Sequence, residues 1–191
     1  MSQSIFREYR TEAILIFVSV AALGFTLGYL IEQAGPIDRP LDGLAVGESA
    51  PPIRASAWIN GAAPSPEALT GEVVVLEVWA SYCFPCQFKT PQLVEAYEQY
   101  KDKVQFIGLT SEGPERLEEV NQFLVDYKVE WPNGYGPEAV NTIVSYQSNF
   151  IPEMWVIGRD GKVVWNHNSE GSIIDGIELA LNPPAATASA E

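Results

Sequence analysis

Positively charged residues are scarce in this chain. It carries 11 Lys and Arg residues against 25 Asp and Glu residues, which gives a formal net charge of −14 at pH 7. No basic stripe is present that could release counterions from phosphate groups, so we expect no nucleic-acid partner. The glycines are scattered and form no phosphate-binding loop. We therefore expect no cofactor.

Histidine and cysteine are also scarce. His167 is the only histidine, and Cys83 and Cys86 are the only cysteines. A metal site built from these three side chains is one alternative, but zinc ligands normally follow characteristic spacings, which these three do not. We expect no metal and interpret His167 as a surface residue that follows a strand.

The two cysteines lie in the motif Cys83-Phe84-Pro85-Cys86, shortly after the apolar run Val73 to Trp79. A C-x-x-C motif that joins a strand to a helix is typical of dithiol–disulfide exchange. The helix N-terminus directs unpaired N–H groups and the positive end of its dipole at the first sulfur, which favours the thiolate. Cys86, one helical turn later, can then attack a mixed disulfide and release the partner.

Glu77 interrupts the apolar run six residues before Cys83. Burial makes the ionised carboxylate costly, so the pKa of Glu77 should rise. Such a group can take a proton from Cys86 as that thiol attacks. The alternative is an acid at the sheet edge in solvent; the apolar neighbours on both sides favour the buried, catalytic interpretation.

The N-terminal region contains 19 residues without charge, 13–31. As a helix they reach about 28 Å, close to the thickness of a bilayer core. We predict an uncleaved transmembrane signal anchor here, with residues 1–12 in the cytoplasm. Arg7 and Arg10 precede the span, so the catalytic domain is expected outside the cytoplasm, in the periplasm.

The rest of the chain is predicted to contain one domain. We expect a linker at 32–46, the domain at 47–182 and a disordered tail at 183–191. Periodicity predicts strands at 53–59, 73–79, 104–109, 154–157 and 163–165. It predicts helices after Cys86, from Pro114 to Tyr127, between Pro137 and Asn149, and at 173–181. This order predicts an α/β fold, a mixed central β-sheet with helices on both faces, preceded by one transmembrane helix.

Four groups of residues together resemble the thioredoxin superfamily. They are the segment Val75 to Cys86, then Pro91, then Ile151-Pro152, and then Asp160-Gly161-Lys162-Val163. With the expected anchor, the chain most resembles the TlpA-type branch of membrane-tethered, extracytoplasmic thiol–disulfide oxidoreductases. The resemblance runs from about Gly47 to Leu181 and implies a thioredoxin-like fold.

The resemblance implies a role for each matching residue. Cys83 matches the nucleophilic cysteine, Cys86 the resolving cysteine of the redox disulfide, and Glu77 a buried acid. Pro152 matches a cis-proline that faces the disulfide, and the backbone before it would pair with an extended substrate. The residues expected to bind substrate are Trp79, Tyr82, Phe84, Pro85, Ile151 and Pro152.

Several positions depart from the usual pattern; besides Tyr82 and Glu153 they include the intervening pair Phe84-Pro85 and Met154. Tyr82 stands where the family usually has Trp. Glu153 follows the proline, where small polar residues are commoner, and either adds a charge beside the expected docking groove or points into water.

The resemblance implies an enzyme that reduces protein disulfides, for example in cytochrome c maturation. Its expected partners are protein disulfide substrates and a membrane thiol protein that donates electrons. Two alternatives remain open. A thiol peroxidase on a related fold has Thr three residues before the reactive cysteine, where this chain has Ala80. A non-enzymatic binding module would use the cysteine pair only for structure, although so short a disulfide loop constrains little chain.

Overall fold

The computed structural model describes residues 17–26, 29 and 43–184. The chain divides into two units, Met1–Arg39 and Pro40–Glu191. Residues 17–26 of the first unit are helical. Within the ranges just given, no helix combines the length and apolar character needed to cross a membrane. The predicted cytoplasmic segment 1–12, most of the linker 32–46, most of the tail 183–191 and part of the anchor 13–31 lie outside the described residues.

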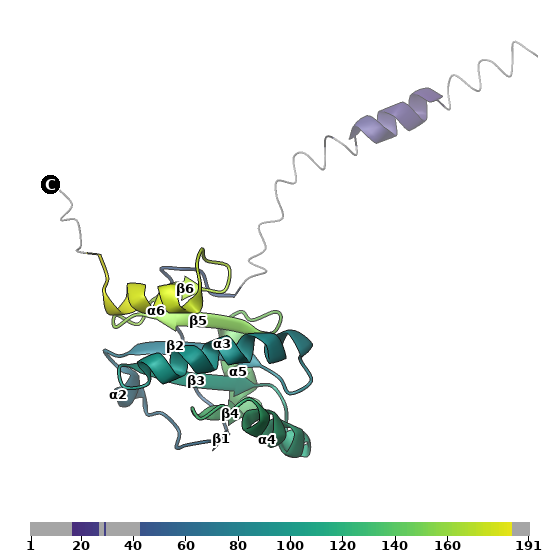
Figure 1. The fold of residues 1–191 in the computed structure, drawn as a ribbon. Helices are drawn as coiled ribbons and strands as arrows, with labels where there is room; N and C mark the ends of the chain where they lie inside the picture. Colours follow the sequence, from purple (N-terminus) through teal and green to yellow (C-terminus); the bar gives the residue numbers. More distant parts are fainter. Residues whose placement is uncertain (1–16, 27–28, 30–42, 185–191) are drawn as a thin grey trace, which may run out of the picture. The chain divides into compact units, whose positions relative to one another are not determined.

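The second unit is built on one sheet with the strand order β1-β4-β3-β2-β5-β6 (Figure 1). Its strands are β1 (Ala57–Ile59), β2 (Val73–Trp79), β3 (Val104–Thr110), β4 (Asn133–Tyr135), β5 (Glu153–Ile157) and β6 (Val163–Asn166). β2, β3 and β4 run parallel to one another, whereas β1, β5 and β6 pair antiparallel with their neighbours. The sheet is therefore mixed, as predicted.

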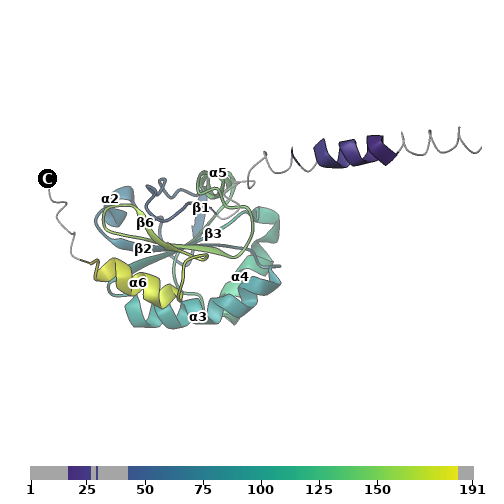
Figure 2. The same cartoon turned by 90° about the horizontal axis from the view of Figure 1, so that it is seen from above.

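Helices cover both faces of the sheet. They are α2 (Pro66–Leu69), α3 (Phe84–Tyr100), the 3-10 turn η1 (Pro114–Arg116), α4 (Leu117–Asp126), α5 (Pro137–Ser145) and α6 (Ile173–Leu181). Figure 2 shows α3, α4 and α6 on one side of the sheet and α2 and α5 on the other. The predicted α/β architecture, a mixed sheet with helices on both faces, is confirmed.

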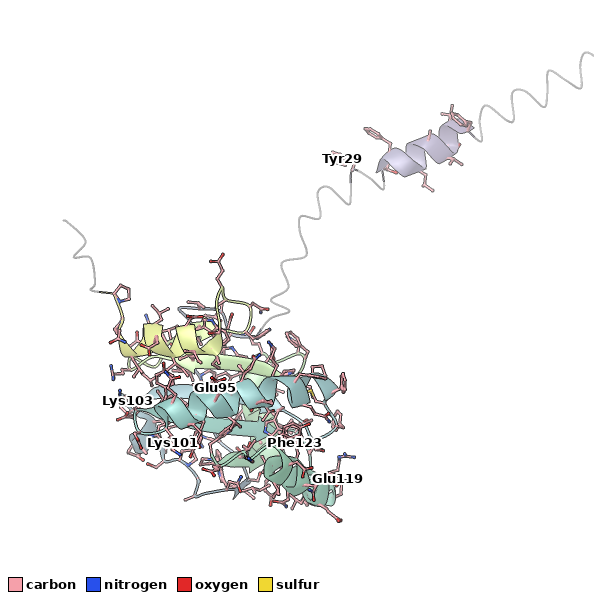
Figure 3. The ribbon with its side chains drawn as sticks, viewed as in Figure 1. Tyr29, Glu95, Lys101, Lys103, Glu119 and Phe123 are labelled. Atoms are coloured by element: carbon pink, nitrogen blue, oxygen red, sulfur yellow. A yellow bond between two sulfur atoms is a disulfide. The ribbon has the colours of Figure 1, made fainter. Side chains whose placement is uncertain are left out.

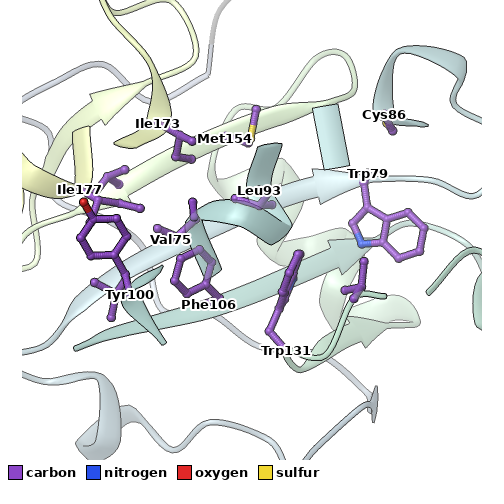
Figure 4. Close-up of a cluster of buried hydrophobic side chains, with 14 of the residues drawn as sticks. Val75, Trp79, Cys86, Leu93, Tyr100, Phe106, Trp131, Met154, Ile173 and Ile177 are labelled. Atoms are coloured by element: carbon purple, nitrogen blue, oxygen red, sulfur yellow. The ribbon is translucent and has the colours of Figure 1, made fainter. Parts of the chain in front are cut away.

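β2 lies in the middle of the sheet because its side chains are apolar on both faces. All seven of its residues are buried. Val75 and Trp79 pack in the core under α3, α4 and α6, whereas Leu76 and Val78 pack in the core under α5. Figure 4 shows the first of these cores, with Val75, Trp79 and Cys86 drawn together. The alternation places Glu77 on the same face as Cys86.

The domain begins earlier than the predicted boundary at Gly47. Leu44 is buried, and its carbonyl accepts hydrogen bonds from Trp155 Nε1 at 3.2 Å and Asn166 Nδ2 at 3.1 Å. The backbone of Gly47 and Glu48 then pairs with Val163 at the edge of β6. The last residues of the predicted linker therefore belong to the folded domain, because these polar contacts hold them on the sheet.

Gly108 lies beside Glu77 in the sheet, where no larger residue fits. A Cβ there would overlap Asn133 Oδ1 and lie 3.0 Å from Trp79 Nε1. We expect Gly108→Ala to lower the free energy of unfolding by about 2–3 kcal/mol through overpacking, measured by urea denaturation. Gly158→Ala is the control: its Cβ would meet the tips of Val164 and Asp160 on the β5–β6 turn. An equal loss in both variants would contradict this explanation.

Candidate active site

The two cysteines lie at the carboxyl end of β2, where the chain turns into α3. They form a disulfide with a Cα–Cα distance of 5.2 Å. Cys83 keeps 5% of its surface exposed, whereas Cys86 is fully buried. Cys83 is therefore the sulfur that a partner can reach, and Cys86 lies behind it.

Cys83 is the N-cap of α3. Its Sγ accepts a hydrogen bond from the backbone N–H of Cys86 at 3.2 Å, and its own N–H donates to Ala80 O at 3.1 Å. Pro85 occupies the first turn, where a missing N–H costs nothing. The sulfur thus lies where the helix dipole and the Cys86 N–H favour negative charge, so we expect them to favour the thiolate once the disulfide is reduced.

Glu77 is buried on the same side of the sheet as this disulfide. It is 3% exposed, so the alternative of an acid in solvent is wrong. Oε1 makes no hydrogen bond, and desolvation by burial raises the pKa of Glu77 to about 8. Its sheet neighbours are Gly108 and Met154, which add no charge. At neutral pH the carboxyl is therefore mostly protonated, and its minor ionised fraction can accept a proton.

A groove of about 740 Å³ opens beside the motif. Phe84, Pro85 and Phe88 line its α3 side, and Pro152 lines the opposite side. The Ile151–Pro152 peptide is cis, as the resemblance implies. Phe84 and Phe88 are 66% and 64% exposed and meet edge to face at 4.7 Å. The groove is therefore apolar beside Phe84 and Pro85 of the motif.

Three of the six expected substrate-binding residues, Phe84, Pro85 and Pro152, line this groove. Tyr82, Phe84 and Pro85 are exposed, and Ile151 and Pro152 are half-buried.

Trp79 does not lie at this surface and is a correction to the predicted set. It is 2% exposed, and its indole Nε1 donates to Asn133 Oδ1 at 2.8 Å. Its ring stacks on Phe123 with a centroid distance of 4.5 Å. It therefore supports the end of β2 from inside the core and offers no face to a substrate.

Glu153 is a second correction. It is fully buried and pairs in register with Val78, so it faces the core on the α5 side of the sheet. If Gly43 carried a Cβ, that atom would lie 3.0 Å from Glu153 Oε1, so the Glu153 side chain is packed close to the backbone of Gly43. The residue after the cis-proline therefore adds no charge to the groove and does not point into water.

The predicted surface position of His167 is only partly observed. The residue is half-buried, and its ring lies edge-on against Phe150 with a centroid distance of 4.9 Å. Among the side chains that the structure describes, no group of three or more His, Cys, Asp and Glu residues is placed to hold a metal ion.

Two residues beside the disulfide were not predicted from the sequence. Glu112 and Arg116 follow β3 and contact the short segment between β2 and Cys83. Because β2 and β3 are parallel, the loops at their carboxyl ends lie together. Glu112 lies two residues after the end of β3, but that position alone does not indicate a contact with the segment before Cys83.

Comparison with known proteins places the fold and the site in context. A family model described as the AhpC/TSA family matches residues 46–166. A thiol-disulfide oxidoreductase ResA of Bacillus cereus is 27% identical over 154 residues, which cover 79% of this chain and 82% of the relative. ResA of Bacillus thuringiensis subsp. konkukian is 28% identical over 156 residues, with the same coverage.

Solved structures agree with these relatives. The thioredoxin domain of thiol-disulfide oxidoreductase BVU-2223 from Bacteroides vulgatus has a TM-score of 0.62 at 22% identity, and the match covers 73% of this chain and 99% of that one. The thioredoxin-like superfamily protein SPOA0173 has a TM-score of 0.56 at 26% identity, covering 72% of this chain and 96% of that one. These matches confirm the thioredoxin-like fold.

Proposed function

We propose that this chain, which belongs to the AhpC/TSA family of thioredoxin-like proteins, is a thiol–disulfide oxidoreductase that acts through Cys83 and Cys86. The observation that carries the proposal is the position of Cys83 Sγ. It caps α3, accepts the Cys86 N–H and keeps the only exposure of the pair. Relatives named thiol-disulfide oxidoreductase, such as ResA of Bacillus cereus, support the same class of reaction.

The reaction begins with the reduced dithiol. The Cys83 thiolate attacks one sulfur of a substrate disulfide, so the substrate S–S bond breaks and a mixed disulfide forms. The released substrate thiolate takes a proton. In molecules where Glu77 is ionised, Cys86 then loses its proton to that carboxylate and attacks Cys83. The Cys83–Cys86 bond forms as the mixed disulfide breaks, and the second substrate sulfur leaves as a thiolate that takes the proton back from Glu77. Two electrons have then moved from the dithiol to the substrate.

We propose the reducing direction, in keeping with the TlpA-type resemblance. A membrane thiol protein would return electrons to Cys83–Cys86 after each cycle. Protein disulfides, including those of cytochrome c maturation, are the proposed substrates. The apolar groove beside Cys83 supports a polypeptide substrate, because a half-buried cis-proline loop faces exposed aromatic rings across it.

The test is reduction of insulin disulfides by the purified protein, with dithiothreitol as the electron source. We expect turbidity to develop faster than with dithiothreitol alone, and a reduction potential near that of thioredoxin, about −270 mV. A much higher potential would instead favour an oxidase. Consumption of peroxide with Cys83 oxidised to sulfenic acid, and no insulin reduction, would favour the thiol peroxidase.

We also propose that residues 13–31 anchor the domain on the outer side of the cytoplasmic membrane. The 19 uncharged residues and the two arginines before them support this location. In cells, the protein should sediment with membranes, and a protease added to spheroplasts should digest the domain. Recovery of the full-length protein in the cytoplasmic fraction would contradict the anchor.

A further inference from the structure

The position of Cys83 depends on a very short connection. Between the end of β2 at Trp79 and Cys83, the chain has only Ala80, Ser81 and Tyr82. The Cys83 N–H donates to Ala80 O, which makes Ser81 and Tyr82 the central residues of a tight turn. Any displacement of these two residues therefore moves the sulfur relative to the first turn of α3.

Glu112 holds the first of these turn residues. Its side chain is 2% exposed. It accepts hydrogen bonds from Ser81 N and Ser81 Oγ, both at 2.6 Å, and from Thr110 Oγ1 at 3.2 Å. One buried carboxylate thus binds both the backbone and the side chain of Ser81.

Arg116 contacts Tyr82, the second turn residue, and also binds Glu112. Its Nε donates to Glu112 Oε1 at 2.8 Å, and its guanidinium lies 5.4 Å from the centre of the Tyr82 ring. Glu119 of α4, labelled in Figure 3, approaches the same guanidinium at 3.9 Å. The Arg116 guanidinium therefore lies between the Glu112 carboxylate and the exposed ring of Tyr82, which is next to Cys83 in the chain.

The charge state of Glu112 differs from that of Glu77. Burial alone would raise the pKa of Glu112, but the hydrogen bonds from Ser81, Arg116 and Thr110 outweigh it and lower the pKa below its usual value. Glu112 is therefore ionised at neutral pH, and charge-assisted hydrogen bonds of this kind are the strong ones. The carboxylate is a fixed acceptor rather than a proton carrier.

We propose that Glu112, together with Arg116, is a positioning residue for thiol–disulfide exchange that holds the turn at Ser81 and Tyr82 and so keeps Cys83 at the N-terminus of α3. The inference rests on the proposed function. It matters most in the reduced protein, because reduction removes the covalent bond between Cys83 and Cys86. The contacts that Glu112 and Arg116 make with the turn do not depend on that bond and hold the reduced sulfur near the Cys86 N–H.

The test compares the pH at which Cys83 becomes reactive in the reduced full-length protein, using iodoacetamide in the Cys86→Ser background. Glu112→Ala should raise the midpoint by about one pH unit, a tenfold loss of thiolate stability. In the background with both cysteines, it should lower kcat/KM for insulin about tenfold. Glu112→Gln should restore most of both values, because its amide oxygen can still accept the Ser81 N–H.

Thr142→Val is the control for a merely structural effect. Thr142 is buried in α5 and exchanges hydrogen bonds with the backbone of Arg54 on the other face of the sheet. This variant should lose stability and keep the wild-type midpoint. If Glu112→Ala does not fold, Arg116→Met is tested in its place, because the Arg116 side chain is 39% exposed and its replacement disturbs the core less. The midpoint of Cys83 alkylation is then expected to rise by about half a pH unit.

An unchanged or lowered midpoint in the folded variant would overturn the proposal, because positioning of the thiolate requires a rise. Failure of the proposed function gives a different result. In that case the wild-type protein itself reduces no insulin, while the alkylation midpoints still show whether Glu112 positions Cys83.

Discussion

Replacing Cys83 with Ser is expected to abolish insulin reduction, with a loss of at least about 10³-fold in rate. A hydroxyl does not exchange with disulfides, and Cys86 cannot take over because it is fully buried. The measurement is the dithiothreitol-driven insulin assay with the reduced proteins. Equal rates for the variant and the wild type would favour the non-enzymatic binding module.

Cys86→Ser should behave differently, because it removes the resolving thiol and leaves Cys83, the more accessible of the two. Cys83 can still attack, so mixed disulfides should accumulate and survive until an external thiol is added. Non-reducing electrophoresis of cell envelopes would show them as bands that disappear on reduction. The double variant Cys83→Ser/Cys86→Ser is the matched control and should give no such bands. Bands that persist in the double variant would exclude Cys83 as the attachment point.

The parts of this fold that the sequence predicts well have local causes. β2 has the expected bounds, Val73–Trp79, because a continuous apolar run fits a strand buried on both faces. α6 has the expected bounds, Ile173–Leu181, because apolar periodicity follows a Ser172–Asp175 capping box. The pairing of Cys83 with Cys86 can also be predicted from the local sequence, because two cysteines three residues apart lie on one helical turn.

The parts that the sequence does not predict depend on contacts between distant segments. β4 contains only Asn133, Gly134 and Tyr135, and it exists because β3 and β1 pair with it on either side. The first strand, expected from Ile53, begins at Ala57, because Arg54 bonds with Thr142 of α5 instead.

The same limit applies within the active site. Glu77 could be identified because it interrupts its own strand. Glu112 could not, because its contact with Ser81 spans 31 residues and becomes visible only when the ends of β2 and β3 are placed together. The orientation of Glu153 depends on the register of β5 against β2. A shift of one residue would have turned its side chain toward the groove.

Glu77→Gln is expected to remove a pH dependence from the stability of the oxidised protein. The pKa of Glu77 is about 8 when folded, against an ordinary value of 4.5 for the unfolded chain. Below pH 4.5 both states carry the proton. Between the unfolded and the folded pKa of Glu77, only the unfolded state loses the proton. The free energy of unfolding of the wild type should therefore fall by about 1.4 kcal/mol per pH unit as the pH rises through this range. Above about pH 8 the total loss, on the order of 4–5 kcal/mol, should be complete.

Urea denaturation at about pH 4.5 and about pH 9 measures this difference. The Gln variant cannot ionise, so it should match the wild type within about 1 kcal/mol at the lower pH and exceed its stability by several kcal/mol at the higher pH. Glu95→Gln makes the same chemical change on the exposed side of α3, where Figure 3 labels the residue. It should follow the wild-type curve. A wild-type curve parallel to that of Glu77→Gln would show that the buried carboxyl does not carry the dependence.

The same substitution should slow one chemical step and spare another. Attack by Cys83 on a substrate does not use Glu77, so formation of the mixed disulfide should keep its rate. Resolution requires deprotonation of Cys86, and loss of a general base at neutral pH typically costs about 10²-fold. Rapid acid quenching of a single turnover should therefore show mixed disulfide accumulating in Glu77→Gln. If only formation of the mixed disulfide were slower, Glu77 would instead act on the Cys83 thiolate.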